Sequence, residues 1–432
     1  MNRERIVELD KLHVWHPYTA MSRYVAEIDP LVIVRAEGSR LFDADGRSYL
    51  DANSSWYCAA LGHRHPRLVA ALCEQAESLC HVALAGVTHE PVVRLAAELS
   101  ARAPGTLPHV FFSDDGSTAV EAALKLAAQY WAQNGRPARR RFVALEGAFH
   151  GETLGATMLG GIELFRRAFA GLVGDCLRVP TDAGGYERTF AVLSELVAAH
   201  ADEIAAVVLE PVVQGAGGMR IYDPGLVRAA REITARHDLF LVLDEVFTGY
   251  GRTGPMWAAE HAGVEPDLVC VAKGFTSGLL PMAATLASRR IFEGFLGDPA
   301  RAFMHGHTFT GNPLGARVAL EVLAVFRDER VIELARPKAA RIAACFARLG
   351  ALPGVVASRS LGMVAALDLN TRGYLDQAGW RVYEEARRRG AYLRPLGSTV
   401  YVTPPINIPD AELDELLGIV EESVTLVCRR DA

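Results

Sequence analysis

Residues 239–254 read Leu-Phe-Leu-Val-Leu-Asp-Glu-Val-Phe-Thr-Gly-Tyr-Gly-Arg-Thr-Gly, an uninterrupted apolar run that stops abruptly at an acid. A short continuous run such as Leu239–Leu243 is typical of a strand covered on both faces of a parallel sheet. Four similar runs are His109–Ser113, Arg141–Leu145, Ala205–Leu209 and Asp267–Ala272. A helical pattern over Pro224–Asp238 is long enough for a crossover between two of these strands. The sequence therefore predicts an α/β fold with a mostly parallel sheet.

The two ends of the chain have a different pattern. Helical segments there alternate with short strand-like runs at Leu31–Ala36, Arg40–Asp43, Met363–Leu367, Ala391–Leu393 and Thr399–Val402. We expect residues 56–325 to form a large domain, and residues 1–55 and 326–432 to form together a smaller α+β domain. A chain of 432 residues is too long for one simple core, which favours such a division.

Composition and charge exclude several functional classes. Half of the residues are hydrophobic and 22% are charged, which is typical of a folded globular protein. The net charge of -6 argues against a nucleic-acid surface, which would need a basic stripe. No secretory leader and no long apolar run are visible, so neither export nor a membrane span is expected. The seven cysteines include no Cys-x-x-Cys pair, which favours free thiols in a reducing cytoplasm.

Three of the predicted strands are followed by a charged residue, namely Glu210, Asp244 and Lys273. Ligands of open parallel sheets bind beyond the carboxyl ends of the strands, so these side chains would share one crevice. A structural salt bridge is the alternative for any one of them. Pyridoxal 5'-phosphate (PLP) requires a lysine that forms an imine with it and an acid that keeps its pyridine nitrogen protonated. The sequence thus predicts that Lys273 and Asp244 are catalytic residues of a PLP site.

PLP also needs a cradle for its phosphate. Residues 111–117 (Phe-Phe-Ser-Asp-Asp-Gly-Ser) lead from a predicted strand into a predicted helix at Thr118–Trp131, in which apolar residues recur at helical spacing. Gly116 and Ser117 would then lie at a helix N-terminus, where free N–H groups and the helix dipole attract an anion. Ser117 as a simple N-cap is the alternative. Together with the lysine and the acid, the phosphate site is the better interpretation.

Two other motifs carry less weight. Residues 249–254 match the dinucleotide fingerprint Gly-x-Gly-x-x-Gly, but they do not directly follow their strand, and no acidic strand end follows at the usual distance. Histidines at positions 63, 65, 305 and 307 suggest a metal, but neither pair has helical ligand spacing and no nearby Cys or carboxylate completes a set. We expect neither NAD nor a metal.

The segment Asp244–Gly254, followed by Ala272-Lys273-Gly274, resembles the signature of class III aminotransferases of PLP fold type I, the aspartate aminotransferase-like fold. Within that class, other segments are similar to the subfamily of the biotin pathway that aminates 7-keto-8-aminopelargonate (8-amino-7-oxononanoate). These segments are Trp15–Thr19, Ser54–Tyr57, His81–His89 and Met304–Phe309. The similarity extends over nearly the whole chain.

The resemblance implies roles for individual residues. Lys273 would carry PLP and Asp244 would pair with its pyridinium, in a homodimer whose active sites are shared between subunits. The cofactor-binding residues would be Gly116, Ser117, Phe149, Asp244, Lys273, His307 and Thr308, of which the last two would reach the phosphate of the neighbouring subunit's cofactor. The substrate-binding residues would be Tyr18, Trp56, Phe149, Lys273, Gly306 and Arg394.

Three of these substrate-binding residues also have a physical rationale. The planar fork of Arg394 suits the carboxylate at the far end of the keto acid, although a plain surface arginine is the alternative. Tyr18 and Trp56 offer flat faces for the adenine of S-adenosyl-L-methionine, the usual amino donor of the subfamily.

Two residues depart from the family pattern. Phe149 stands where Tyr is usual, which keeps a ring to stack on the cofactor but removes a hydroxyl, and His307 stands where Pro is common. The donor therefore stays open between S-adenosylmethionine and lysine. Two other hypotheses remain, namely another class III enzyme such as an ω-amino acid or diamine transaminase, and a PLP-binding protein without turnover.

Overall fold

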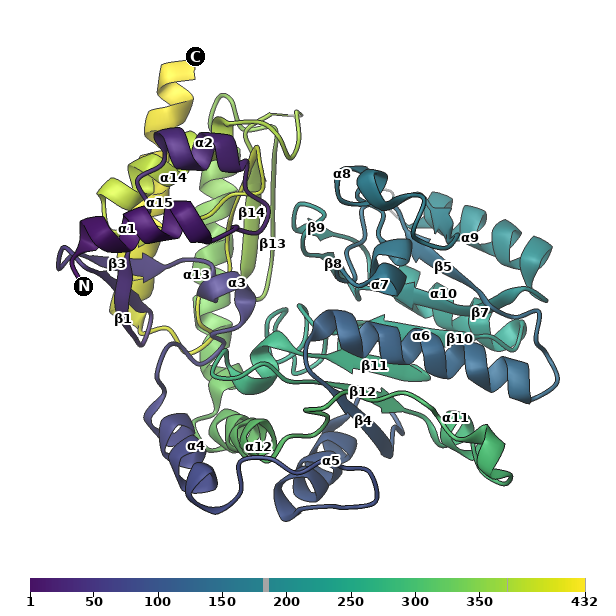
Figure 1. The fold of residues 1–432 in the computed structure, drawn as a ribbon. Coiled ribbons are helices and arrows are strands. Elements are labelled where there is room, and N and C mark those ends of the chain that lie inside the picture. The colour runs from purple at the N-terminus through teal and green to yellow at the C-terminus, as the bar shows by residue number, and fades with distance from the viewer. Residues whose placement is uncertain (182–185, 371, 432) are drawn as a thin grey trace.

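A computed structural model of the chain describes residues 1–181, 186–370 and 372–431. Its largest sheet has seven strands in the order β4-β12-β11-β10-β7-β5-β6 (Figure 1). They are β4 (His109–Ser113), β5 (Arg141–Leu145), β6 (Leu177–Val179), β7 (Ile204–Leu209), β10 (Phe240–Asp244), β11 (Leu268–Val271) and β12 (Ala283–Ala287). The pairs from β11 to β6 are parallel, and β12 is antiparallel to both of its neighbours. The mostly parallel sheet is confirmed, but β6 and β12 were not predicted.

Both faces of this sheet are buried, which explains the continuous apolar runs. In β10, Phe240 and Val242 belong to a core shared with α6 (Gly116–Gln133), whereas Leu241 belongs to a core shared with α10 (Gly225–Arg236). Successive residues of a strand point to opposite faces. A strand between two helical layers must therefore be apolar at every position.

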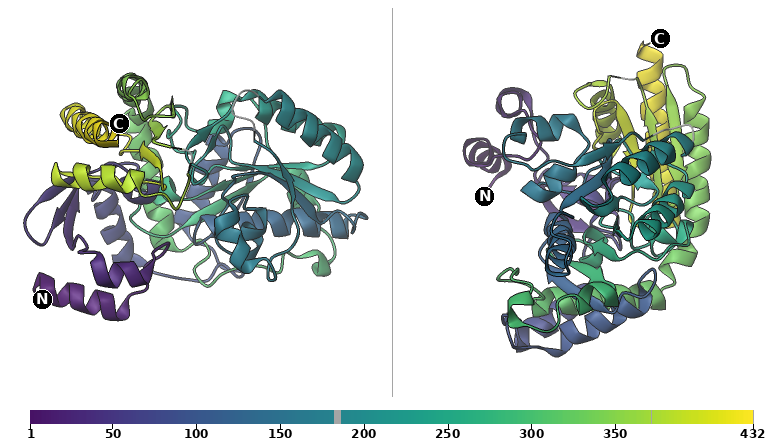
Figure 2. Two further views of the ribbon diagram at one scale, coloured as in Figure 1. Left: turned by 90° about the horizontal axis from the view of Figure 1, so that it is seen from above. Right: turned by 90° about the vertical axis from the view of Figure 1, so that its right-hand side faces the viewer.

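The two ends of the chain build a second part beside this sheet (Figures 1 and 2). The N-terminal strands β1 (Ile33–Glu37), β2 (Arg40–Asp43) and β3 (Ser48–Asp51) are joined by β15 (Ala391–Tyr392), which pairs in parallel with β3. A separate three-stranded sheet contains β13 (Ala357–Leu361), β14 (Val364–Asp368) and β16 (Thr399–Val402). Strands β3 and β13 were not predicted, and the proposed domain boundaries stay a prediction.

The remaining elements surround these sheets. The helices are α1 (Arg3–His13), α2 (Met21–Glu27), α3 (Ser54–Tyr57), α4 (Pro66–Ser78), α5 (Glu90–Arg102), α7 (Leu154–Leu159), α8 (Glu163–Arg166), α9 (Glu187–His200), α11 (Arg289–Glu293), α12 (Pro313–Asp328), α13 (Val331–Gly350), α14 (Ala378–Arg388) and α15 (Asp410–Asp431), and a short hairpin contains β8 (Val213–Gln214) and β9 (Arg220–Ile221). No helix in the described ranges has the length and apolar character needed to cross a membrane.

The sheet order brings three functional candidates to one edge. Strand β10 lies between β7 and β11, and all three run in the same direction. Their carboxyl ends therefore meet, and Glu210, Asp244 and Lys273 are found there at the ends of three adjacent strands. Helix α6 begins three residues after β4, whose carboxyl end lies at the same edge because β4 is antiparallel to β12.

Candidate active site

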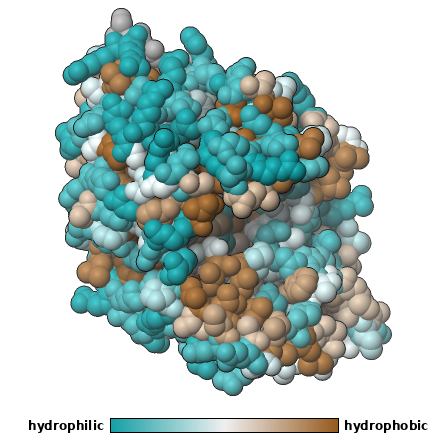
Figure 3. Space-filling model, turned by 60° about the vertical axis from the view of Figure 1, so that its left-hand side comes forward, coloured by the Kyte–Doolittle hydropathy of each residue, from teal (hydrophilic) through white to brown (hydrophobic). Residues whose placement is uncertain are grey.

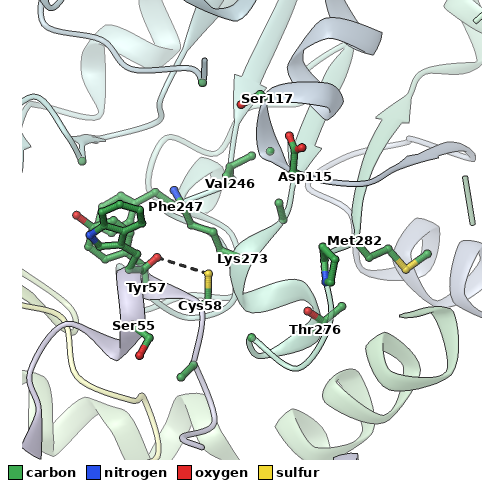
Figure 4. Close-up of a pocket in the computed structure, with 18 of the residues that line it drawn as sticks. Ser55, Tyr57, Cys58, Asp115, Ser117, Val246, Phe247, Lys273, Thr276 and Met282 are labelled. Atoms are coloured by element: carbon green, nitrogen blue, oxygen red, sulfur yellow. Dashed lines mark hydrogen bonds between the residues drawn. The ribbon is translucent and has the colours of Figure 1, made fainter. Parts of the chain in front are cut away.

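A cavity of about 830 Å³ lies at this edge of the sheet, and Glu210, Asp244 and Lys273 all line it. The molecular surface is hollowed on the face shown in Figure 3, with hydrophobic residues gathered beside the hollow. In the close-up, Lys273 extends into the cavity beside Phe247, and Ser117 stands across from it (Figure 4). The three charged residues singled out from the sequence thus share one space.

Lys273 occupies a special backbone position. It opens a short 3-10 turn after β11 and has a φ of 49°, in the left-handed region that non-glycine residues rarely adopt. Its ammonium lies 5.2 Å from the ring centre of Tyr57 and 5.9 Å from that of Phe247. Within the described ranges no carboxylate lies in salt-bridge distance of Lys273. An amine held among aromatic rings without an ion pair is available for covalent attachment.

Asp244 is held by a buried histidine. Its Oδ2 lies 2.7 Å from Nδ1 of His150, and its Oδ1 accepts a hydrogen bond from the backbone N–H of Val246 at 3.1 Å. Burial acts to lower the pKa of His150, but the hydrogen bond and the charge of Asp244 outweigh it and raise that pKa. The imidazole therefore fixes the orientation of the carboxylate.

Glu210 also lines the cavity, where its carboxylate binds two backbone N–H groups. Its two carboxylate oxygens accept hydrogen bonds from the backbone N–H groups of Phe149 and Gly215, each at 2.9 Å. Burial raises the pKa of Glu210 to about 7, and the nearby charge of Asp244 acts in the same direction. Glu210 thus anchors the loop that carries Phe149 and His150 over the strand ends.

Replacing Glu210 with Gln should change how stability depends on pH. Glu210 binds its proton at higher pH in the folded chain than in the unfolded chain, so its contribution to stability is full below about pH 4.5 and is lost as the pH rises towards 7. In the cofactor-free protein, the loss of unfolding free energy between about pH 5 and 8 should be smaller in Glu210→Gln by roughly 2 to 3 kcal/mol. Urea unfolding of both proteins at both pH values measures this difference in unfolding free energy. The same change with pH in the wild type and in Glu210→Gln would contradict the raised pKa of Glu210.

The start of α6 forms the expected anion site. Asp115 is the N-cap, since its side chain accepts the backbone N–H of Thr118 at 2.9 Å, so the alternative that Ser117 is the N-cap is wrong. Within the described ranges the backbone N–H groups of Gly116 and Ser117 have no acceptor. A Cβ at position 116 would lie 2.6 Å from Cγ1 of Val246, so only glycine fits. Two free N–H groups at a helix N-terminus thus face the cavity.

Three of the expected substrate-binding residues line the cavity beside Lys273. Tyr18, Trp56 and Phe149 line it, and the Tyr18 and Trp56 rings meet edge to face at 5.9 Å. Trp56 belongs to the turn Ser54–Tyr57, whose four residues all have φ between 45° and 71°, a left-handed conformation. Such strain in non-glycine residues is characteristic of functional sites.

Arg394 does not line the cavity but contacts a residue that does. Its guanidinium lies 5.2 Å from the ring centre of Trp56 and 5.8 Å from that of Trp380, and its backbone N–H donates to Oδ1 of Asn53 at 2.6 Å. In the described part of the chain it makes no salt bridge. The alternative of a plain surface arginine does not fit a half-buried guanidinium between two indole rings. Its donors are free to bind an anion.

The structure adds site residues that the sequence did not reveal. The hydroxyl of Tyr18 donates a hydrogen bond to the carboxylate of Glu152, which lines the cavity. Phe165 contacts Tyr18 at 5.3 Å and Tyr374 at 4.9 Å between ring centres. These residues and His150 come together only through tertiary structure, because they belong to segments far apart along the chain.

Three predicted residues lie outside the cavity of their own chain. Gly306 and Thr308 are exposed, and His307 contacts Asp114 instead. Their assignment to the cofactor of a partner subunit stays a prediction. His63 and His65 pair with carboxylates, and the described residues contain no group of three His, Cys, Asp or Glu that could hold a metal.

Comparison with known proteins identifies the family. The profile of the family described as Aminotransferase class-III matches residues 21–424. The chain belongs to the class III aminotransferases. It is therefore an aminotransferase, and the predicted family is confirmed.

Relatives of known name extend over the whole chain. The adenosylmethionine-8-amino-7-oxononanoate aminotransferase of Nitratidesulfovibrio vulgaris is 42% identical and covers 99% of this chain and 83% of its own. The protein of the same name from Synechococcus elongatus is 41% identical over 95% of this chain and 98% of its own.

Solved structures agree with this. A crystal structure of the enzyme of that name from Methanocaldococcus jannaschii has a TM-score of 0.95 at 34% identity, covering 98% of this chain and 99% of its own. The ω-transaminase of Pseudomonas jessenii in complex with PMP has a TM-score of 0.93 at 26% identity, covering 98% of each chain. The expected fold, PLP fold type I, is confirmed.

Proposed function

We propose that this aminotransferase transfers an amino group to 8-amino-7-oxononanoate, giving 7,8-diaminopelargonate in biotin biosynthesis, with S-adenosyl-L-methionine as the donor. The observation that carries this proposal is the 42% identity, over 99% of the chain, to a relative named for that reaction. The cavity supports it, because it combines a lysine and an acid with a wall of aromatic side chains. Arg394, which has no salt-bridge partner among the described residues, lies over the ring of Trp56 in that wall. Both substrates are small molecules, and we propose that the enzyme acts on them in the cytoplasm.

The cofactor that fits this cavity is PLP. Lys273 would bind it covalently, the free N–H groups of Gly116 and Ser117 would hold its phosphate, and Asp244 would hold its pyridine nitrogen. Phe149 lines the same cavity and would cover the ring of PLP. When bound, PLP supplies an electron-withdrawing ring that stabilises the carbanion formed at Cα of the substrate. The free N–H groups at the start of α6 are the feature of the chain that best matches its phosphate.

The residues around the cavity would have different roles in the reaction. Asp244, oriented by His150, would keep the pyridine nitrogen of PLP protonated. The amine of Lys273 would act as general base and acid, taking the proton from Cα of the substrate and returning it. Glu152, Tyr18 and Trp56 would line the place of the donor, and because donor and acceptor use one cavity, we propose that they bind in turn.

Arg394 should control the affinity for the keto acid. An Arg-carboxylate pair in a partly buried site contributes about 1.5 to 3 kcal/mol, so Arg394→Met should raise the KM for 8-amino-7-oxononanoate roughly 10- to 100-fold with a smaller change in kcat. Arg394→Lys keeps the positive charge without the planar guanidinium, so its KM should lie between those of the wild type and Arg394→Met. The methyl ester of the acceptor should be almost insensitive to Arg394→Met. If Arg394→Met raised the KM for the acid and for the ester equally, Arg394 would not bind the substrate carboxylate.

A donor panel tests the reaction itself. Purified protein loaded with PLP is mixed with 8-amino-7-oxononanoate and S-adenosylmethionine, lysine or a simple amine, and the diamine product is measured by mass spectrometry. We expect product with S-adenosylmethionine. Product only with lysine would correct the donor, and amination of pyruvate or 2-oxoglutarate alone would favour an ω-amino acid transaminase. Failure of every donor to convert bound PLP to its amine form would favour a protein without turnover.

We also propose a homodimer. Gly306 and Thr308 lie outside the cavity of their own chain, and the same loop exposes Met304 and Phe309, large apolar side chains that are 88% and 57% exposed. Apolar residues gathered on a surface are characteristic of contacts between proteins. In a dimer this loop would complete the phosphate site of the partner subunit.

A further inference from the structure

The turn that leads into the phosphate cradle contains two adjacent carboxylates. Asp114 and Asp115 directly precede Gly116 and line the same cavity as the free N–H groups. A carboxylate beside a phosphate dianion opposes its binding, because like charges a few ångströms apart repel. Such acids are therefore unexpected in a phosphate site unless each is occupied elsewhere.

The carboxylate of Asp115 is occupied within the helix. Its Oδ1 accepts the backbone N–H of Thr118 at 2.9 Å, and the Thr118 hydroxyl accepts the N–H of Asp115 at 3.0 Å, so the two residues form a capping box. This arrangement accounts for Asp115 as part of the helix start. Among the described residues, the carboxylate of Asp114 has no partner in α6, although its backbone N–H donates to the Thr118 hydroxyl at 3.3 Å.

The partner of Asp114 is His307. Nδ1 of His307 lies 2.9 Å from Oδ2 of Asp114, and no other side chain in the described ranges binds that carboxylate. His307 is itself held, because its backbone N–H donates to Oγ1 of Thr310 at 2.9 Å and its ring meets that of His305 edge to face at 5.2 Å. His307 does not line the cavity.

We infer that His307 is a positioning residue for the phosphate cradle and acts through Asp114. Its hydrogen bond holds one oxygen of Asp114 on the loop around residues 303–310 and so keeps the carboxylate from turning towards Gly116 and Ser117. This role rests on the proposed PLP site and differs from a direct contact between His307 and a partner's phosphate.

Cofactor-free protein can be titrated separately with PLP and with pyridoxal, which lacks the phosphate. The dissociation constant of each ligand is obtained from the change in absorbance when it binds. His307→Ala should weaken PLP binding about five- to tenfold, the scale of one side-chain hydrogen bond, and leave pyridoxal binding unchanged. His307→Asn places an amide N–H where Nδ1 stands and should bind PLP almost normally. In the double variant with Asp114→Asn, the loss caused by His307→Ala should disappear.

Three outcomes would overturn the inference. Unchanged PLP binding in His307→Ala would show that the pair does not matter. An equal loss for PLP and pyridoxal would indicate general damage to the loop. A double variant as weak as His307→Ala would show that the imidazole acts directly on a phosphate. Since no amino donor or acceptor is used, a wrong substrate leaves these titrations intact, whereas wild-type protein that binds neither ligand would end both the PLP proposal and this inference.

Discussion

Lys273→Ala should abolish turnover while the protein still binds PLP. Lys273 is the only lysine among the described residues that line the cavity, and the proposed function assigns to its amine both the covalent bond to the cofactor and the transfer of the proton at Cα. General acid-base catalysis alone contributes on the order of 10² to 10⁴ in rate, so the combined loss should exceed about 10⁴. The phosphate contacts at Gly116 and Ser117 are untouched, which preserves part of the affinity.

The measurement is the initial rate of diamine formation, together with a PLP titration of each protein. Lys11→Ala is a suitable control, because Lys11 lies in α1 and donates to the backbone carbonyl of Val25, away from the cavity. It should have wild-type activity. A Lys273→Ala protein that keeps more than about one hundredth of the wild-type rate would exclude the catalytic role, because the loss would be far below that expected.

Asp244→Asn should lower kcat by roughly two to three orders of magnitude, the scale seen when one preorganised electrostatic contact is removed from an active site. A neutral amide cannot favour the protonated pyridine nitrogen, and it also leaves His150 without its charge partner. Because that partner raises the pKa of His150, the buried imidazole should lose its proton at lower pH in the variant. The ring would then no longer transmit a positive charge to the site.

Glu245→Gln provides the matched control. Glu245 is adjacent to Asp244 and also buried, but it does not line the cavity, and it accepts hydrogen bonds from Thr248 and from the backbone of Ala259. Its loss should lower stability and leave kcat per folded molecule close to that of the wild type. If Glu245→Gln impaired kcat as much as Asp244→Asn, the acid at 244 would have no special role.

Strand positions were predictable where burial on both faces imposed apolar runs. Strand β10 shows this, because each of its first four residues enters one of two cores. Strand β12 (Ala-Ala-Thr-Leu-Ala) gives no such signal, because small residues suffice where α6 packs closely, and Oγ1 of Thr285 donates to the backbone of Ala119. Strand β3 pairs with β15, more than 300 residues away, so its partner cannot be inferred from local pattern.

Some residues of the candidate site were likewise predictable from the sequence, whereas others depend on the tertiary fold. Lys273 and Asp244 stand out because a charged residue interrupts an apolar run, and Gly116 because it opens a helix. That Asp115 and not Ser117 is the N-cap depends on backbone geometry, which a sequence with several capping residues in a row leaves open. His150 and Glu152 follow Phe149 closely, yet their partners, Asp244 and Tyr18, are set by the tertiary fold.

The most direct measurement uses the scarcity of lysine in this chain, which has lysine only at positions 11, 125, 273 and 338. Protein loaded with PLP is reduced with borohydride, which fixes the cofactor to the lysine that binds it, and is then digested and mapped by mass spectrometry. The cavity geometry predicts a cofactor adduct on the peptide that contains Lys273 and on no other. An adduct on Lys11, Lys125 or Lys338, or none at all, would contradict it.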